Sequence, residues 1–153
     1  VAIRFAEVQV GSHDATRLPS TPVDDGGMLL RLAADIQVVG IDEAQFFDSG
    51  LPAVCEELAA RGVRVIIAGL DMDFLGKPFG PRPALLAVAE YVTKVHAICM
   101  RCGALANFSH RKHGSTDLIH LGETESYEPL CRACFEEAKA GKQGTVAQRE
   151  ARD

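Results

Sequence analysis

The segment IQVVGIDE, residues 36–43, decides the fold that we expect for this chain. Its first six residues are mostly apolar and rich in β-branched side chains, a pattern typical of a short buried strand. Asp42 and Glu43 follow, so two carboxylates would stand at the C-terminal end of that strand. Residues 63–70 are almost uniformly apolar, as in a strand of a parallel sheet that is covered on both faces. The two segments predict a parallel sheet.

The residues around these strands have the patterns of helices. Apolar side chains recur at helical spacing over residues 25–34, before the first strand. Pro52 suits the first turn of a helix that ends near residue 60, and Gly62 supplies its stop. A further helix is predicted over residues 84–90. Because strands and helices alternate, we expect an α/β fold.

The composition bounds the class of protein. The chain has 153 residues, of which 47% are apolar, and this is enough for a buried core. The formal net charge of −5 argues against a surface that coats nucleic acid. The sequence contains no apolar run of the roughly 20 residues that a membrane-spanning helix needs, and it does not begin like a secretory signal peptide. We expect a cytoplasmic protein without a membrane or nucleic-acid partner.

Two Cys-x-x-Cys pairs, Cys99 with Cys102 and Cys131 with Cys134, supply the four thiolates of a tetrahedral zinc site. Disulfides are the first alternative, but they are rare in cytosolic proteins. A redox dithiol is the second, but it would not need another pair. Four sulfur ligands leave no open position for water or substrate, so the pattern predicts structural zinc. Cys55 lies in a predicted helix and is expected to be a small core residue.

The carboxylates after the first strand have two interpretations. Asp42 occupies the position of a Walker B acid, which holds Mg²⁺ in phosphate-binding α/β folds. Glu43 could then take a proton from a substrate hydroxyl. Alternatively, both acids only cap the next helix.

Aromatic residues favour the first interpretation. Phe46 and Phe47 stand close after the acids, separated from them only by Ala44 and Gln45, and Phe74 and Phe79 follow the second strand. In open α/β sheets, ligands bind beyond the carboxyl ends of the strands. A carboxylate base beside aromatic faces suits a planar heterocycle that carries a reactive hydroxyl. The alternative is that these phenylalanines belong to the core.

Four blocks of sequence together resemble the zinc-containing thymidine kinases. They are IDEAQFFD at 41–48, AGLDMDFLGKPFG at 68–80, AICMRCG at 97–103 and ETESYEPLCRAC at 123–134. They stand in the family's order and near its spacing, and the resemblance extends from about residue 8 to residue 134. It implies a P-loop NTPase-like core with a parallel sheet, and a small zinc-binding lobe that carries a loop called the lasso.

The resemblance implies roles for individual residues. Glu43 matches the general base that deprotonates the nucleoside 5′-hydroxyl, and Asp42 matches the Mg²⁺-linked acid. Tyr127 matches a tyrosine that packs on the base from the lasso, while Ser109 and Leu118 match positions near the 5-substituent of the base. The other positions that match the nucleoside pocket are Phe46, Leu70, Phe74 and Phe79.

The resemblance also implies the reaction and the partners. The expected activity is transfer of the ATP γ-phosphoryl group to thymidine, giving thymidine monophosphate for the salvage of DNA precursors, and deoxyuridine is a further acceptor that it allows. Mg²⁺ would accompany ATP, and zinc would be structural. The family resemblance further implies a homotetramer and feedback inhibition by thymidine triphosphate.

The domain organisation follows from these motifs. Residues 1–95 are predicted to form the nucleotide-binding α/β core. Residues 96–140 are predicted to form the zinc lobe, with β-like pieces at 106–110 and 117–121 and a helix at 131–140. Residues 141–153 are polar and are predicted to be a flexible tail.

The chain departs from the family in one respect. The family opens with a Gly-x-x-x-x-Gly-Lys-Ser/Thr phosphate loop, and this motif does not occur in the sequence. Residues 1–5 look like a strand joined directly to a segment that stands further on in the family. We expect that the complete kinase has phosphate-binding segments beyond these residues; the alternative is a truncated, inactive chain.

Two other functions compete with the kinase interpretation. The first is a non-enzymatic zinc module that binds nucleic acid. Basic residues near the cysteine pairs support it, namely Arg101, Arg111, Lys112 and Arg132, whereas the acidic balance counts against it. The second is an ATPase of the DExQ helicase kind, which the short chain and the want of further helicase motifs disfavour.

Overall fold

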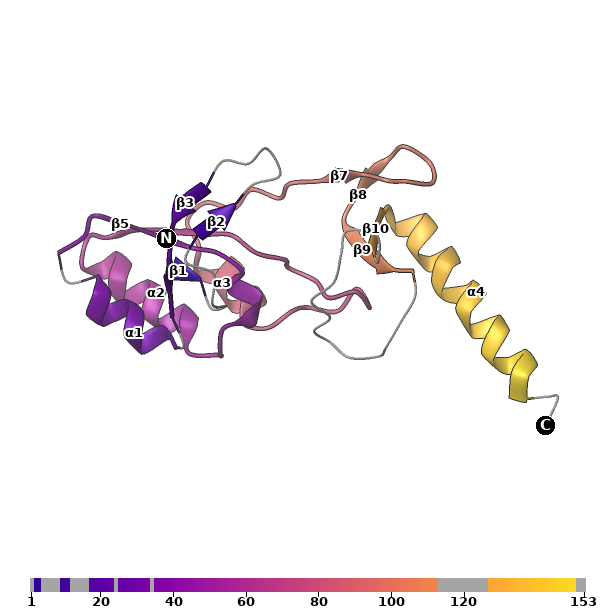
Figure 1. Cartoon of the computed structure of the whole chain (residues 1–153), viewed down its shortest axis with the longest axis horizontal. Coiled ribbons are helices and arrows are strands. Elements are labelled where there is room, and N and C mark those ends of the chain that lie inside the picture. Colours follow the sequence, from indigo (N-terminus) through magenta and orange to yellow (C-terminus); the bar gives the residue numbers. More distant parts are fainter. Residues whose placement is uncertain are drawn as a thin grey trace. The chain divides into compact units, whose positions relative to one another are not determined.

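The computed structural model describes residues 2–3, 9–11, 17–23, 25–33, 35–112 and 127–150, and the side chains of 19–23, 25–33, 35–112 and 127–141. The chain divides into two compact units. Unit 1 comprises Val1–Asp71 and Pro78–Val92, and unit 2 comprises Met72–Lys77 and Thr93–Asp153. The segment Met72–Lys77 therefore belongs to unit 2, although the residues on both sides of it belong to unit 1. Figure 1 labels most of the helices and strands of both units.

A parallel sheet forms the centre of unit 1. Its strands are β4 (Thr21–Pro22), β1 (Ala2–Ile3), β5 (Val38–Ile41) and β6 (Arg64–Ile67), in that order, and every neighbouring pair is parallel. The pairing of β5 with β6 runs from Val38 opposite Arg64 to Ile41 opposite Ile67. The predicted parallel sheet is thus confirmed. Strands β2 (Gln9–Gly11) and β3 (Arg17–Pro19) form a separate antiparallel pair.

Three helices accompany the sheet, and each has a local cause. Helix α1 (Gly26–Leu32) begins after Asp25, whose side chain accepts a hydrogen bond from the Met28 amide at 2.8 Å. Helix α2 (Leu51–Ala60) has a proline in its first turn and ends before Gly62, which has a φ of 84°. Helix α3 (Arg82–Val88) begins two residues earlier than predicted, after Pro81.

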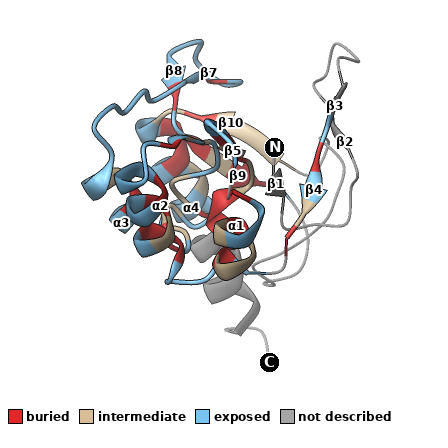
Figure 2. Ribbon diagram, turned by 90° about the vertical axis from the view of Figure 1, so that its left-hand side faces the viewer, coloured by how far each residue is buried: buried red, intermediate tan, exposed pale blue. Residues whose placement is uncertain are grey.

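Side chains of helices α1, α2 and α3, of strand β5 and of the adjoining loops form the core of unit 1, and Figure 2 colours buried residues red. Its buried side chains are Val23, Leu29, Ala33, Val39, Ile41, Ala44, Phe47, Leu51, Cys55, Leu58, Val63 and Leu85. Cys55 is therefore the core residue that the sequence predicted. The predicted cover on both faces of the sheet is wrong for the described residues. Strand β6 is an edge strand there, and Val38 and Ile66 are 55% and 54% exposed.

Unit 2 consists of two antiparallel ribbons and a helix. Strand β7 (Ala97–Ile98) pairs with β8 (Leu105–Ala106), and β9 (Phe108–Arg111) pairs with β10 (Tyr127–Leu130). The predicted β-like piece at 106–110 is found as parts of β8 and β9, whereas the piece at 117–121 lies outside the described residues.

The core of unit 2 is small. Phe108 and Phe135 stack with their ring centroids 4.4 Å apart, and Leu130, Cys99, Ala106 and Cys134 complete the buried cluster. Gly76 lies against both rings: a Cβ there would stand 3.1 Å from Phe135 and 3.2 Å from Phe108.

Helix α4 (Arg132–Glu150) is longer than the helix predicted at 131–140. It passes Gly141 without a break. Among the described helices, none is long and apolar enough to cross a membrane.

The packing of α2 gives a stability prediction. Leu58 is fully buried, so Leu58→Ala should lower the free energy of unfolding by about 2–5 kcal/mol through lost burial and the cavity left behind. Leu32→Ala is the matched control, because Leu32 is 47% exposed at the end of α1 and its truncation should cost less than about 1 kcal/mol. Chemical denaturation followed by circular dichroism measures both; equal losses would contradict the described core.

Candidate functional site

Two hydrogen bonds hold the C-terminal ends of β5 and β6 together. The Ala68 amide donates to the Ile41 carbonyl at 2.8 Å, and the Ala44 amide donates to the Ala68 carbonyl at 3.1 Å. Asp42 and Glu43 stand between these bonds in the chain, directly after β5. The structure thus places both carboxylates at the carboxyl edge of the parallel sheet, where α/β folds bind ligands.

Glu43 has an unusual backbone. Its φ of 52° and ψ of 39° are left-handed, and it is the one non-glycine residue with positive φ among the described residues. This conformation costs about 1–2 kcal/mol for an L-residue. The Glu43 amide donates to Asp42 Oδ1 at 2.9 Å, and the Glu43 carboxylate accepts a hydrogen bond from Gln45 Nε2 at 2.5 Å. Strained backbone held by its neighbours is common at functional sites.

The geometry counts against helix capping as the purpose of these acids. Glu43 precedes the short 3-10 helix Ala44–Phe46, but its side chain makes no capping hydrogen bond. Helix α2 has Gly50 at its N-cap, also without a side-chain cap. Neither Asp42 nor Glu43 therefore serves the helix that follows.

The predicted aromatic residues of unit 1 have different environments. Phe46 and Phe79 are half-buried and pack edge to face, with ring centroids 5.4 Å apart. Leu70 is 48% exposed at the end of β6. Phe47, by contrast, is 4% exposed and belongs to the core, so the core interpretation is correct for this phenylalanine.

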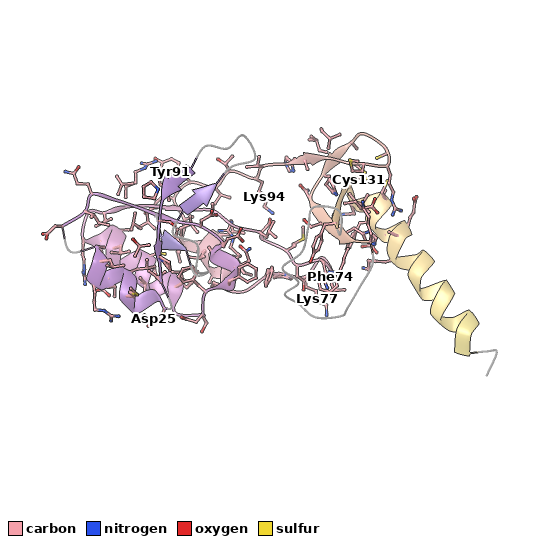
Figure 3. All side chains as sticks on the ribbon, viewed as in Figure 1. Asp25, Phe74, Lys77, Tyr91, Lys94 and Cys131 are labelled. Atoms are coloured by element: carbon pink, nitrogen blue, oxygen red, sulfur yellow. The ribbon has the colours of Figure 1, made fainter. Side chains whose placement is uncertain are left out.

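The predicted pocket residues of unit 2 gather around Arg111. Its guanidinium carbon lies 3.9 Å from the centroid of the Phe74 ring and 5.2 Å from that of Tyr127 (Figure 3 labels Phe74). Arg111 Nε and Nη2 both donate to the Tyr127 hydroxyl, at 3.1 and 2.6 Å. Ser109 is half-buried two residues earlier on β9, and Leu118 lies outside the described residues.

The contacts of Arg111 and Gln45 were not predicted from the sequence. Arg111 was counted only as a basic residue that favours nucleic-acid binding, yet it is 4% exposed. Arg101 donates to Glu128 Oε1 at 2.6 Å. The Arg132 guanidinium carbon lies 5.1 Å from the centroid of the Phe108 ring, so three of the four basic residues behind that interpretation are engaged within unit 2. Arg111 lies outside the four blocks that resemble the kinase family, and a single arginine has no characteristic spacing. Nothing in the sequence therefore predicted its contacts with Phe74 and Tyr127.

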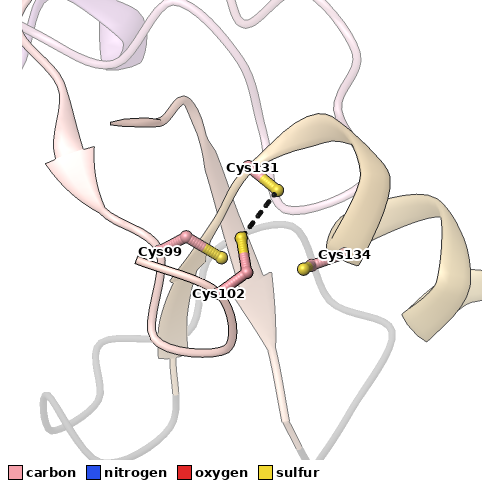
Figure 4. A group of neighbouring side chains, drawn as sticks. All are labelled: Cys99, Cys102, Cys131 and Cys134. Carbon is pink, nitrogen blue, oxygen red and sulfur yellow. Dashed lines mark hydrogen bonds between the residues drawn. The ribbon is translucent and has the colours of Figure 1, made fainter. Parts of the chain in front are cut away.

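The four cysteines form a compact cluster in unit 2. Their Sγ atoms all lie within 4.8 Å of one another, and Cys102 Sγ is 3.6 Å from Cys131 Sγ (Figure 4). All four thiols are free. Cys99 and Cys102 come from the turn after β7, Cys131 follows β10, and Cys134 lies in the first turn of α4. Four convergent sulfurs are the donor set of a tetrahedral zinc site.

The electrostatics of the cluster favour a bound cation. A hydrogen bond from the backbone of Cys131 is the main cause that lowers the pKa of Cys99 to about 6. The neighbouring Cys131 thiol is the main cause that raises the pKa of Cys134 to about 12. The Cys99 thiolate thus forms readily, whereas the hydrogen bond with Cys131 favours the neutral thiol of Cys134. A divalent cation bound among the sulfurs would stabilise their thiolate forms.

Hydrogen bonds brace the strands beside the cysteines. The Met100 amide donates to the Pro129 carbonyl at 3.0 Å, which ties the first cysteine turn to β10. Glu128 Oε1 lies 2.6 Å from Arg101 and 3.1 Å from His110 Nδ1, and the Arg101 guanidinium is the main cause that lowers the pKa of Glu128. The cysteine turn and the β9–β10 ribbon are thus linked by polar contacts as well as by sulfur.

The comparisons with known proteins agree on one family. A family model described as thymidine kinase matches residues 2–135. The thymidine kinase of Bacteroides fragilis (strain YCH46) is 59% identical over 135 residues, which is 88% of this chain and 68% of that protein. The thymidine kinase of Porphyromonas gingivalis (strain W83) is 51% identical over 94% of this chain and 70% of its own length. That of Rhodothermus sp. is 53% identical, with 87% and 62% covered.

The cysteine cluster gives a prediction about metal content. The purified full-length protein should retain roughly one zinc ion per chain after dialysis, as a closed four-cysteine site does. Cys131→Ser should lose most of that zinc, because it removes one of the clustered sulfurs. Cys55→Ser is the matched control, since Cys55 lies in the core of unit 1 and should leave the zinc content unchanged. Plasma mass spectrometry measures the zinc content of both variants. Loss of zinc in Cys55→Ser, with zinc retained in Cys131→Ser, would exclude the cysteine cluster as the zinc site.

Proposed function

The chain belongs to the thymidine kinase family, and we propose that Glu43 is the general base with which this enzyme phosphorylates the 5′-hydroxyl of thymidine. As a thymidine kinase it takes thymidine and ATP as substrates. The observation that carries the proposal is the placement of Asp42 and Glu43 at the carboxyl edge of the sheet. Neither side chain caps the helix that follows.

The reaction needs little from the protein beyond proton transfer, positioning and charge. The 5′-oxygen of thymidine attacks the γ-phosphorus of ATP and passes its proton to the Glu43 carboxylate. The bond from that phosphorus to the bridging oxygen breaks, and ADP leaves. A positioned general base contributes about 10²–10⁴-fold to the rate, and the remainder comes from alignment and electrostatic stabilisation.

Asp42 is the residue that we assign to the Mg²⁺ that accompanies ATP. It is a half-buried carboxylate at the end of β5, and carboxylate oxygen is the ligand that Mg²⁺ prefers. Magnesium bound with ATP offsets the negative charge of the phosphates. Asp42 Oδ1 also accepts the Glu43 amide, so the same side chain helps to fix the backbone that carries the base.

The residues assigned to nucleoside recognition come from the family resemblance. In unit 1 the half-buried pair Phe46 and Phe79 and the exposed Leu70 offer apolar surface at the carboxyl edge of the sheet. In unit 2 the assignment rests on Phe74, Tyr127 and Ser109, and Leu118 joins them from the family resemblance alone. Tyr127 is the residue we propose to pack on the base, and Arg111 holds its hydroxyl in place.

Zinc is proposed as a structural ion of unit 2. It would join Cys99 and Cys102, before the segment 103–130, to Cys131 and Cys134 after it. A bound zinc supplies a cross-link at both ends of that segment, which contains the proposed lasso, without taking part in phosphoryl transfer. The cluster is also part of the unit's small core, so the same ion would stabilise the fold.

Several expectations from the family resemblance stay predictions. They are a P-loop NTPase-like core, the division into core 1–95, zinc lobe 96–140 and tail 141–153, the homotetramer, inhibition by thymidine triphosphate, and a cytoplasmic location. Use of deoxyuridine as a second acceptor belongs with them.

The role of Glu43 is testable in the full-length enzyme. Glu43→Gln keeps the size of the side chain but cannot accept the proton, so turnover should fall about 10²–10⁴-fold. Thymidine binding, measured by calorimetry, should survive. Glu56→Gln is the matched control, because Glu56 is exposed on α2 and should have wild-type turnover. Near-normal turnover of Glu43→Gln would show that another group is the base.

The role of Arg111 gives a second test. Arg111→Met removes both donors to the Tyr127 hydroxyl while keeping much of the side-chain length, so the KM for thymidine should rise roughly 10-fold or more, with a smaller change in kcat. Lys112→Met is the control, because Lys112 is the next residue along the chain and is exposed. An unchanged thymidine KM in Arg111→Met would refute the assignment of Tyr127.

A further inference from the structure

We propose that Gln45 is a positioning residue for the general base, and that its buried amide sets the direction of the Glu43 carboxylate. The inference rests on the proposed role of Glu43. Gln45 is the fourth residue of the segment 42–45 and makes contacts to both strand ends of the candidate site. Its side chain is 2% exposed, which is unusual for glutamine.

The amide of Gln45 is engaged at both of its polar atoms. Its Nε2 donates to Glu43 Oε2 at 2.5 Å, and its Oε1 accepts the Leu70 amide at 2.9 Å. A backbone N–H can only donate, so the amide oxygen must face Leu70. The amide nitrogen therefore has to face Glu43, and the side chain has one orientation that satisfies both contacts.

Gly69 and Gly80 make room for Gln45, because neither has a side chain. A Cβ at Gly69, directly before Leu70, would stand 2.5 Å from Gln45 Oε1 and 2.9 Å from the Ala44 amide nitrogen. A Cβ at Gly80 would stand 2.1 Å from the carbonyl oxygen of Gln45. All three distances are shorter than real Cβ atoms show, so the chain approaches Gln45 on two sides as closely as a residue without a side chain permits.

This arrangement explains how Glu43 keeps its conformation. Its backbone is left-handed, and a carboxylate on such a backbone would otherwise be free to choose among several rotamers. Gln45 is fixed by Leu70 at the end of β6 and in turn holds one carboxylate oxygen of Glu43. The end of the neighbouring strand thereby determines where the base points. A displacement of about 1 Å at a reacting group can cost on the order of 10²-fold in rate.

A purely structural role for Gln45 is the alternative, and a double-mutant cycle separates the two. Gln45→Met keeps the length of the side chain and removes both hydrogen bonds. In the full-length enzyme it should lower the single-turnover rate of thymidine monophosphate formation roughly 10–100-fold, while the Kd for thymidine stays within about threefold. Gln37→Met is the matched control, because Gln37 is exposed before β5 and should leave both quantities unchanged.

The second arm combines Gln45→Met with Glu43→Gln. If Gln45 acts through Glu43, its loss should cost less than about threefold once the base is gone, so the two effects are strongly non-additive. Additive effects, or an unchanged rate in Gln45→Met alone, would overturn the inference. Gln45→Asn serves if the methionine variant fails to fold, because it keeps a polar amide but is one methylene too short to reach both Glu43 and Leu70. The same rate and cycle criteria then decide.

The experiment also separates this inference from the proposed function. Glu43→Gln with a normal rate would remove the general-base assignment itself. Glu43→Gln with a collapsed rate, together with a normal Gln45→Met, would leave the general base in place and reject only the positioning role.

Discussion

The parallel pairing of β5 with β6 is the constraint on which the candidate active site depends. Four consecutive residue pairs, from Val38 with Arg64 to Ile41 with Ile67, bring the ends of the two strands to the same edge. The carboxylates after β5 and the glycine and leucine after β6 are neighbours only because of this register. A shift of one residue would turn every side chain of the strand to the other face and would separate the acids from their partners.

Unit 2 depends on a different constraint, which is the crowding of four thiols. Its buried cluster holds two stacked phenylalanines, one leucine and little else besides the cysteines. So small a core seldom stabilises a fold alone, and small domains commonly add a metal for this reason. The cysteine side chains that help to form the core of unit 2 would also repel one another if their sulfurs were ionised. A bound cation would resolve both problems and would link the fold of the unit to the proposed metal site.

The sequence predicted the elements with strong local patterns and missed the relations between distant residues. The β5 strand, the proline-led helix α2 and the cysteine cluster were found because each has a characteristic periodicity or spacing. The exposed outer face of β6 was not predicted, because an apolar strand gives no sign of whether anything covers it. Arg111 and Gln45 were missed for a related reason. Their importance lies in contacts to Phe74, Tyr127 and Leu70, residues 16 or more positions away in the chain.

The segment Met72–Lys77 limits how the protein can be divided. It stands in the chain between two parts of unit 1, yet Met72 and Gly76 pack in the core of unit 2. The cysteine-bearing unit is therefore discontinuous, and a fragment that starts after residue 92 would lack one wall of its own core. Such a unit cannot be moved by a single genetic fusion, and recombination within the family would have to exchange both pieces together. The two units are thus expected to be inherited as one block, even though each has a core of its own.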